Sequence, residues 1–137
     1  MKKIIMFFLV AGILAACKKD PDYSKPGVSL PEVSNLNIQR TDTNRISLSW
    51  AIPAGIPAEI NQPLSVNVQV TEILSPTRSI VIASEMLPEA PLTWSYTLPN
   101  TAGTYHFTVK LFGTTKSADR NYSNTIYSLG QTAIFNP

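Results

Sequence analysis

The sequence contains very few of the side chains that carry most catalytic and metal chemistry. Its 137 residues include one cysteine and one histidine, and only 15% are charged, against a usual value of about 25%. A zinc site needs several Cys, His or carboxylate ligands, and nucleophilic catalysis needs a base beside the nucleophile. The sequence also contains no Gly-rich phosphate loop, EF-hand spacing or paired-carboxylate motif. These absences predict a protein that is not an enzyme and that binds no metal or other cofactor.

The sole histidine and two aspartates near the N-terminus do not alter this prediction. His106 stands between Tyr105 and Phe107 in an alternating segment, so its side chain is expected on the outside of a strand. Asp20 and Asp22 could contact calcium weakly, but solvated charges are the better interpretation, because the surrounding stretch lacks apolar periodicity.

The chain also lacks the excess of positive charge that nucleic-acid binding requires. Its formal net charge is +2, and Lys2 and Lys3 account for both charges. Without these two of the 11 Lys and Arg, nine remain against nine Asp and Glu. The sequence therefore predicts no nucleic-acid partner.

The N-terminus contains a short hydrophobic segment with a cysteine at its end. Lys2 and Lys3 precede an uncharged run from Ile4 to Ala16, which is shorter than the roughly 20 apolar residues of a membrane span but suits a secretory signal. The segment Leu14-Ala15-Ala16-Cys17 resembles a bacterial lipobox. This resemblance implies that residues 1–16 are removed as a signal peptide and that Cys17 then carries a covalent lipid. A free structural cysteine is the alternative.

Residues 17–30 are predicted to be the lipidated cysteine and a flexible tether, because they combine prolines, a glycine and charges without apolar periodicity. The residue after Cys17 is Lys18, and in lipoproteins of this type the absence of an aspartate there implies the outer membrane. The stretch Lys18 to Asp22 partly resembles the export tag of surface-exposed Bacteroidetes lipoproteins, although Pro21 interrupts its acidic pair. The expected location is therefore the cell envelope, in the outer membrane and at the cell surface.

Residues 31–137 are predicted to form one all-β domain. Seven segments alternate apolar and polar residues with period two, and none has a helical period, which is typical of an antiparallel β-sandwich with one polar face on each strand. Gly130 is expected to be a bulge or kink in the last segment. The seven segments are SNLNIQR, RISLSW, LSVNVQV, SIVIAS, LTWSYTL, TYHFTVKL and NTIYSLGQTAIF.

This region resembles a fibronectin type III domain or a close immunoglobulin-like relative. The residues that carry the resemblance are Leu48-Ser49-Trp50 with Pro53, Leu98-Pro99, Tyr105, and Tyr122-Ser123-Asn124. The resemblance implies that Trp50 anchors the core and that Tyr105 forms a tyrosine corner with the preceding turn. Alternation also places Trp94 on the core side, together with Leu92, Tyr96 and Leu98.

The loops after the second, fourth and sixth strands are the expected binding loops, and this topology places them near the tether. Their apolar residues either cover the end of the core as a lid or form an exposed interface. Phe112 and Tyr122, which flank the sixth loop, are the expected exposed rings. The candidate binding residues are Ile56, Ile60, Met86, Leu87, Lys116, Asp119, Arg120 and Tyr122.

Three functions are compatible with these expectations. The first is a membrane-anchored accessory lipoprotein that contacts a glycan or a neighbouring outer-membrane protein. The second is a structural or adhesive surface subunit that polymerises by strand exchange, which is disfavoured because seven strands already complete the sandwich. The third is an inhibitor-type binding protein, since loops alone can carry that role.

Overall fold

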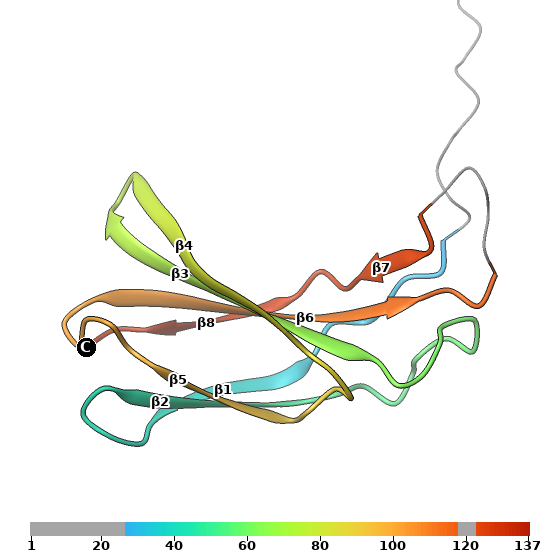
Figure 1. The fold of residues 1–137 in the computed structure, drawn as a ribbon, viewed down its shortest axis with the longest axis horizontal. Helices are drawn as coiled ribbons and strands as arrows, with labels where there is room; N and C mark the ends of the chain where they lie inside the picture. The colour runs from blue at the N-terminus through green and yellow to red at the C-terminus, as the bar shows by residue number, and fades with distance from the viewer. Residues whose placement is uncertain (1–26, 118–122) are drawn as a thin grey trace, which may run out of the picture.

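The computed structural model describes residues 27–117 and 123–137, which form two β-sheets packed face to face (Figure 1). These residues contain eight strands and no helix. The smaller sheet has the order β1-β2-β5, and the larger has the order β4-β3-β6, with β7 and β8 both paired to β6. All of these pairs are antiparallel, which confirms the predicted sandwich. The strands are β1 (Ser34–Arg40), β2 (Arg45–Ala51), β3 (Ser65–Ser75), β4 (Arg78–Leu87), β5 (Thr93–Thr97), β6 (Thr104–Thr114), β7 (Thr125–Tyr127) and β8 (Gln131–Phe135).

The eighth strand arises from a break in the predicted seventh one. Gly130, where a bulge or kink was expected, has a φ of 89°, a left-handed conformation that glycine adopts without a steric cost. Just before it, Ser128 bonds to the β6 backbone twice. Its amide donates to the Leu111 carbonyl at 2.9 Å, and its Oγ accepts from the Leu111 amide at 2.9 Å. The side chain therefore replaces a backbone acceptor where the strand is interrupted.

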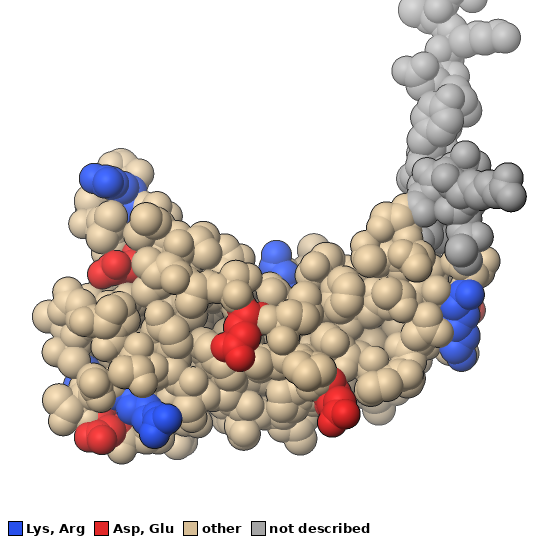
Figure 2. All heavy atoms as spheres, in the orientation of Figure 1, with Lys and Arg blue, Asp and Glu red and all other residues tan. Residues whose placement is uncertain are grey.

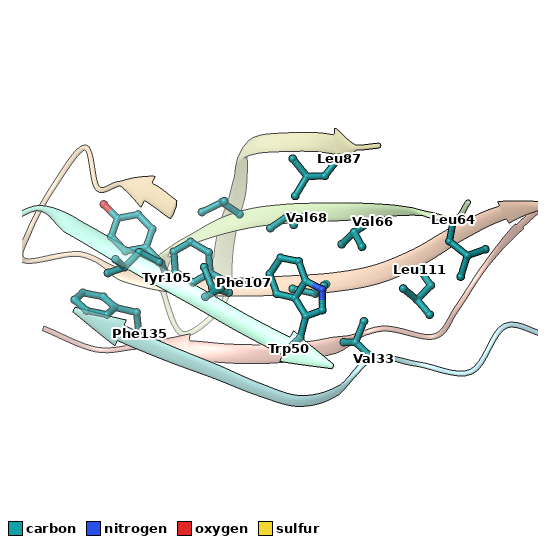
Figure 3. Packing of buried hydrophobic residues seen from close by; sticks show 14 of the residues in the cluster. Val33, Trp50, Leu64, Val66, Val68, Leu87, Tyr105, Phe107, Leu111 and Phe135 are labelled. Atoms are coloured by element: carbon teal, nitrogen blue, oxygen red, sulfur yellow. The ribbon is translucent and has the colours of Figure 1, made fainter. Parts of the chain in front are cut away.

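The core lies between the sheets and follows the predicted alternation. In β3 the residues Val66, Val68 and Val70 are fully buried, and in β6 every second residue from Tyr105 to Leu111 is fully buried. Figure 3 shows the rings of Tyr105, Phe107 and Phe135 toward one end of the core and aliphatic side chains toward the other, with Trp50 between them. Val28 and Leu30 also pack against this cluster, so the packed structure already includes residues ahead of position 31.

The edges between the two sheets are bridged by long side chains. On one edge, Nε1 of Trp94 donates to Oε2 of Glu85 at 3.0 Å, which joins β5 to β4. On the other, the Arg40 guanidinium lies 5.0 Å from the centre of the Phe135 ring, which joins β1 to β8. Trp94 is only half-buried in this position, and Leu92 is 54% exposed, so the expectation that Leu92 lies in the core is wrong. Leu92 precedes β5, where the alternation no longer determines the direction of a side chain.

Tyr105 forms the predicted tyrosine corner. Its hydroxyl donates to the Asn100 carbonyl at 2.9 Å and accepts from the Asn100 amide at 3.2 Å, so one side chain holds both backbone groups of the preceding turn. Gly103 permits this approach, since a Cβ there would lie 2.7 Å from the Tyr105 hydroxyl. Burial raises the pKa of Tyr105, and the carboxylate of Glu72 adds to the increase. The phenol is therefore held in its neutral form.

Trp50→Ala is expected to lower the free energy of unfolding by about 3–5 kcal/mol, because the ring is 5% exposed and its loss leaves a cavity. Trp50→Phe is expected to lose less than half as much. It refills part of the space and removes the indole Nε1, which is buried without a hydrogen-bond partner among the described residues. Urea unfolding of both variants provides the measurement. A loss below about 1 kcal/mol for Trp50→Ala would contradict its place in the core.

Tyr105→Phe is expected to lower stability by about 0.5–1.5 kcal/mol at neutral pH, through loss of the corner hydrogen bond. The folded protein holds the phenolic proton more tightly than the unfolded chain, whose tyrosine pKa is about 10. The contribution of this proton is therefore complete below about pH 10 and is lost as the pH rises further.

Melting temperatures across this alkaline range provide the measurement, and Tyr105→Phe should show a shallower fall than the wild type. Part of the pH dependence should remain in the variant, because burial also raises the pKa of Tyr96. A parallel fall for both proteins would contradict the role of Tyr105. Tyr127→Phe is the control at neutral pH. It removes a tyrosine hydroxyl at a half-exposed position, so its change in stability can be compared with that of Tyr105→Phe.

Candidate binding surface

The loop after β2 folds back onto the end of the core. Ile60 is 1% exposed, and it forms a β-bridge with Thr115 beyond β6. The Asn61 amide donates to the Thr114 carbonyl at 2.8 Å, and Ile56 packs against the core as a partly buried residue. Ile60 therefore belongs to a lid over the end of the core and not to an exposed interface, since a side chain buried to this extent is not available to a partner.

Met86 and Leu87 were expected in a loop, but they are the last two residues of β4. Met86 pairs with Asn67 and Leu87 with Val66 in the neighbouring strand β3. Strand alternation separates their side chains, so Leu87 lies at the core with 9% exposure whereas Met86 is 42% exposed. Only Met86 is on the surface.

The sixth loop is described in part. Lys116 is exposed, and its amide donates to the Glu59 carbonyl at 2.8 Å, which brings this loop beside the one after β2. The other predicted residues of this loop, Asp119, Arg120 and Tyr122, lie outside the described residues, as does Cys17.

Ile60→Asp is expected to lower the free energy of unfolding by at least about 3 kcal/mol, because it removes a buried side chain and places a charge in the core. Met86→Asp is the matched control at an exposed position and should change stability by less than about 0.5 kcal/mol. Thermal melting of the two variants distinguishes a lid from an interface. Equal melting temperatures for Ile60→Asp and the wild type would contradict the burial of Ile60.

The larger sheet presents a polar outer face. The register pairs Asn67 with Lys110, Gln69 with Thr108 and Thr71 with His106, and all of these alternate with buried residues. We use the term outer face for the outward positions of β3, β4, β6, β7 and β8. Figure 2 shows that the surface is hollowed between the β3–β4 hairpin and the β7 end of the molecule. The outward residues of the described strands are Ser65, Asn67, Gln69, Thr71, Ile73, Ser79, Val81, Ser84, Met86, Thr104, His106, Thr108, Lys110, Phe112, Thr114, Thr125, Tyr127, Thr132 and Ile134.

Two aromatic rings lie together at the β7 end of this face. Phe112 and Tyr127 are register partners on β6 and β7, with ring centres 4.9 Å apart and planes inclined by 53°. Tyr127 is 53% exposed, and Leu129, two residues later, is 90% exposed. We call Phe112 and Tyr127 the ring pair. Exposed rings beside polar groups are common in binding sites, since they offer large contact area at a small entropic cost.

Uncharged hydrogen-bonding groups continue along the outer face from the ring pair toward β8 and β4. The Thr108 and Thr132 hydroxyls bond to each other at 2.8 Å, and the Asn67 amide donates to Ser84 Oγ at 3.4 Å. Apart from Arg78 at the tip of the β3–β4 hairpin, only Lys110 of the outward residues in the described strands carries a full charge, and none is a carboxylate. The face therefore combines neutral polar and apolar residues with little charge, and that charge is positive.

The sequence analysis identified one of these two rings. Phe112 was expected to be exposed beside Tyr122, whereas the structure places it in β6 beside Tyr127. Periodicity did not mark Tyr127 as outward, because Ile126 and Tyr127 are adjacent apolar residues. The break at Gly130 also divides the segment, and a single continuous strand does not show which residues of its two halves lie beside β6.

Within residues 27–117 and 123–137, no three or more His, Cys, Asp or Glu side chains are grouped so that they could hold a metal ion. The same part of the chain includes no helix that is long and apolar enough to cross a membrane.

The two antiparallel sheets and the tyrosine corner define a fibronectin type III-like sandwich, as the sequence predicted. The chain belongs to the family described as a domain of unknown function (DUF4945), which matches residues 17–135. No curated protein matches the sequence.

Solved structures of similar fold cover most of the chain. A structure described as a myokine has 13% identity and a TM-score of 0.48, and covers 79% of this chain and 97% of its own. The FN5 domain of Drosophila Lar has 10% identity and a TM-score of 0.45, with coverages of 79% and 98%. The fibronectin type-III domain of human fibronectin type III domain containing protein 3 has 13% identity and a TM-score of 0.49, with coverages of 83% and 93%. Likeness at this level says nothing about a ligand.

Proposed function

We propose that this protein is a lipid-anchored, non-catalytic binding module of the cell envelope that captures carbohydrate. The observation that carries the proposal is the outer face of the larger sheet, where the ring pair, with Tyr127 half-exposed, shares one face with hydroxyl and amide groups. Rings pack against the C–H faces of sugars, and hydroxyl and amide groups exchange hydrogen bonds with sugar hydroxyls. The fibronectin type III-like fold is compatible with such a non-catalytic role.

The surroundings of the sole histidine support a non-catalytic role. His106 lies on the outer face, where its register partners are Thr71 on β3 and Ile134 on β8. A catalytic histidine needs an acid to orient it and a nucleophile within hydrogen-bond distance. The outward positions of the described strands provide no such acid.

The membrane attachment is proposed from the N-terminal sequence. A basic start, a short uncharged run and the segment Leu14 to Cys17 form the pattern of a lipoprotein signal, and the family match begins at Cys17. Two or more acyl chains hold a protein on a membrane stably, at about 0.8 kcal/mol per buried methylene. We place the protein in the outer membrane and at the cell surface, beside a glycan or a neighbouring outer-membrane protein.

The geometry of the last strand supports a binding module over a subunit that polymerises by strand exchange. Donor-strand exchange requires a free position beside an edge of the sandwich. Here β8 pairs with β6 from Gln131 to Phe135, and β1 pairs with β2 at the start of the domain. Both terminal strands are thus supplied by the chain itself.

Cys17→Ala is expected to abolish incorporation of a radiolabelled fatty acid and to release the protein from the membrane fraction, because it removes the thiol that accepts the lipid. The thermal melting of the β-sandwich should stay unchanged, since the substitution alters none of the core residues of the described chain. Cys17→Ser is the second variant, because it keeps the size and polarity of the side chain. Membrane retention of both variants at the wild-type level would contradict the proposed anchor.

A further inference from the structure

We infer that the ring pair and Lys110 form a binding site for an acidic polysaccharide, one that contains uronate sugars. This inference rests on the proposed function and assigns its site and ligand class. The site lies at the β7 end of the outer face, where β6 carries Lys110 and Phe112 two residues apart on the same side. It combines an aromatic platform, a cation and a row of neutral polar groups.

The ring pair provides the platform. The rings of Phe112 and Tyr127 are inclined by 53° with centres 4.9 Å apart, so they form an angled surface and not a flat stack. An aromatic face carries negative partial charge and attracts the weakly positive C–H groups on one side of a pyranose ring. Tyr127 is half-exposed in the absence of any ligand, which leaves much of its ring available for this contact.

Gly130 holds the Lys110 side chain beside the strand break. A Cβ at Gly130 would lie 2.6 Å from Cγ and 3.2 Å from Cε of Lys110, so the aliphatic part of the lysine packs across this glycine. Gly130 lies between β7 and β8, three residues after Tyr127, the last residue of β7. The cation is therefore kept near the ring pair by packing of its stem, and it keeps its charged end for a ligand.

The charge of the outer face favours an acidic ligand. Apart from Arg78 at the tip of the β3–β4 hairpin, Lys110 is the one Lys, Arg, Asp or Glu among the outward residues of the described strands, so no carboxylate there opposes an anionic sugar. A single cation can pair with one carboxylate of a uronate polymer. It is too few for a nucleic acid, whose binding depends on several phosphate contacts.

The length of the polar row favours a polymer over a single sugar. Asn67 faces Lys110 across the β3–β6 pair, and the next pair along contains Gln69 and Thr108. Thr132 extends this row onto β8 through its hydroxyl contact with Thr108. Successive residue pairs on the same face of a strand are separated by about 7 Å, so this row is longer than one sugar unit.

Affinity electrophoresis of the full chain in detergent tests this inference, with polygalacturonate as the acidic polymer and dextran as the neutral one. The wild type is expected to be retarded by polygalacturonate. Tyr127→Ala should weaken binding by about ten-fold, which is typical for loss of one stacking ring. Lys110→Gln should weaken it by about two- to five-fold and remove its salt dependence.

Ile134→Ala is the matched control, because Ile134 has the same 53% exposure as Tyr127 and lies on the same face in β8. It should bind as the wild type does, and all three variants should keep the wild-type melting temperature. If the wild type binds a polysaccharide and Tyr127→Ala and Lys110→Gln bind it equally well, the assigned site is wrong while the proposed function stands.

Three further results would overturn the inference. Equal retardation by dextran and polygalacturonate, unaffected by Lys110→Gln, would leave a carbohydrate module but contradict an acidic ligand. Absence of retardation in both polymers would contradict the inference and the proposed carbohydrate capture together. The protein could instead bind phosphatidylcholine vesicles and neither polymer. If Tyr127→Ala removed that binding, the ring pair would be assigned to the membrane surface.

Discussion

The side-chain alternation of β6 determines both the core and the proposed binding surface. This strand is paired on both sides, with β3 on one and with β7 and β8 on the other, so its register is fixed by three neighbours. Its inward residues include Tyr105 and Phe107, and its outward residues include Lys110 and Phe112. A shift by one residue would bury the lysine and expose the core rings, which makes any other register strongly unfavourable.

This constraint also explains why we place the proposed binding surface on a sheet and not on the loops. The loop after β2 uses Ile60 to close the end of the core, and backbone bonds to Thr114 and from Lys116 hold it there. Its apolar residues pack against the core and are not available to a partner, as the low exposure of Ile60 shows. The outer face has no packing role, so its residues are free to serve recognition, and a rigid sheet holds them in fixed relative positions.

Much of the fold could be predicted from the sequence because each segment is buried on one side only. Alternation identified the strands and the inward valines of β3, and the resemblance to a fibronectin type III domain implied that Tyr105 forms the tyrosine corner. The position of Leu92 was not predictable in this way, since alternation says nothing of a residue outside the ladder. The pairing of Phe112 with Tyr127 depends on contacts between strands, which periodicity within a strand does not contain.

The irregular part of the last strand has the greatest consequence for the proposed site. Ser128 keeps the chain bonded to β6 by using its side-chain oxygen, and Gly130 permits the turn into β8 with its positive φ. This arrangement leaves Leu129 exposed, places Tyr127 beside Phe112, and gives the Lys110 stem a surface without a Cβ. One strand break thus brings an aromatic pair and a cation together on a face that is otherwise neutral. Strand breaks often have this function, since an interruption of the ladder redirects side chains that a regular strand would hold in line.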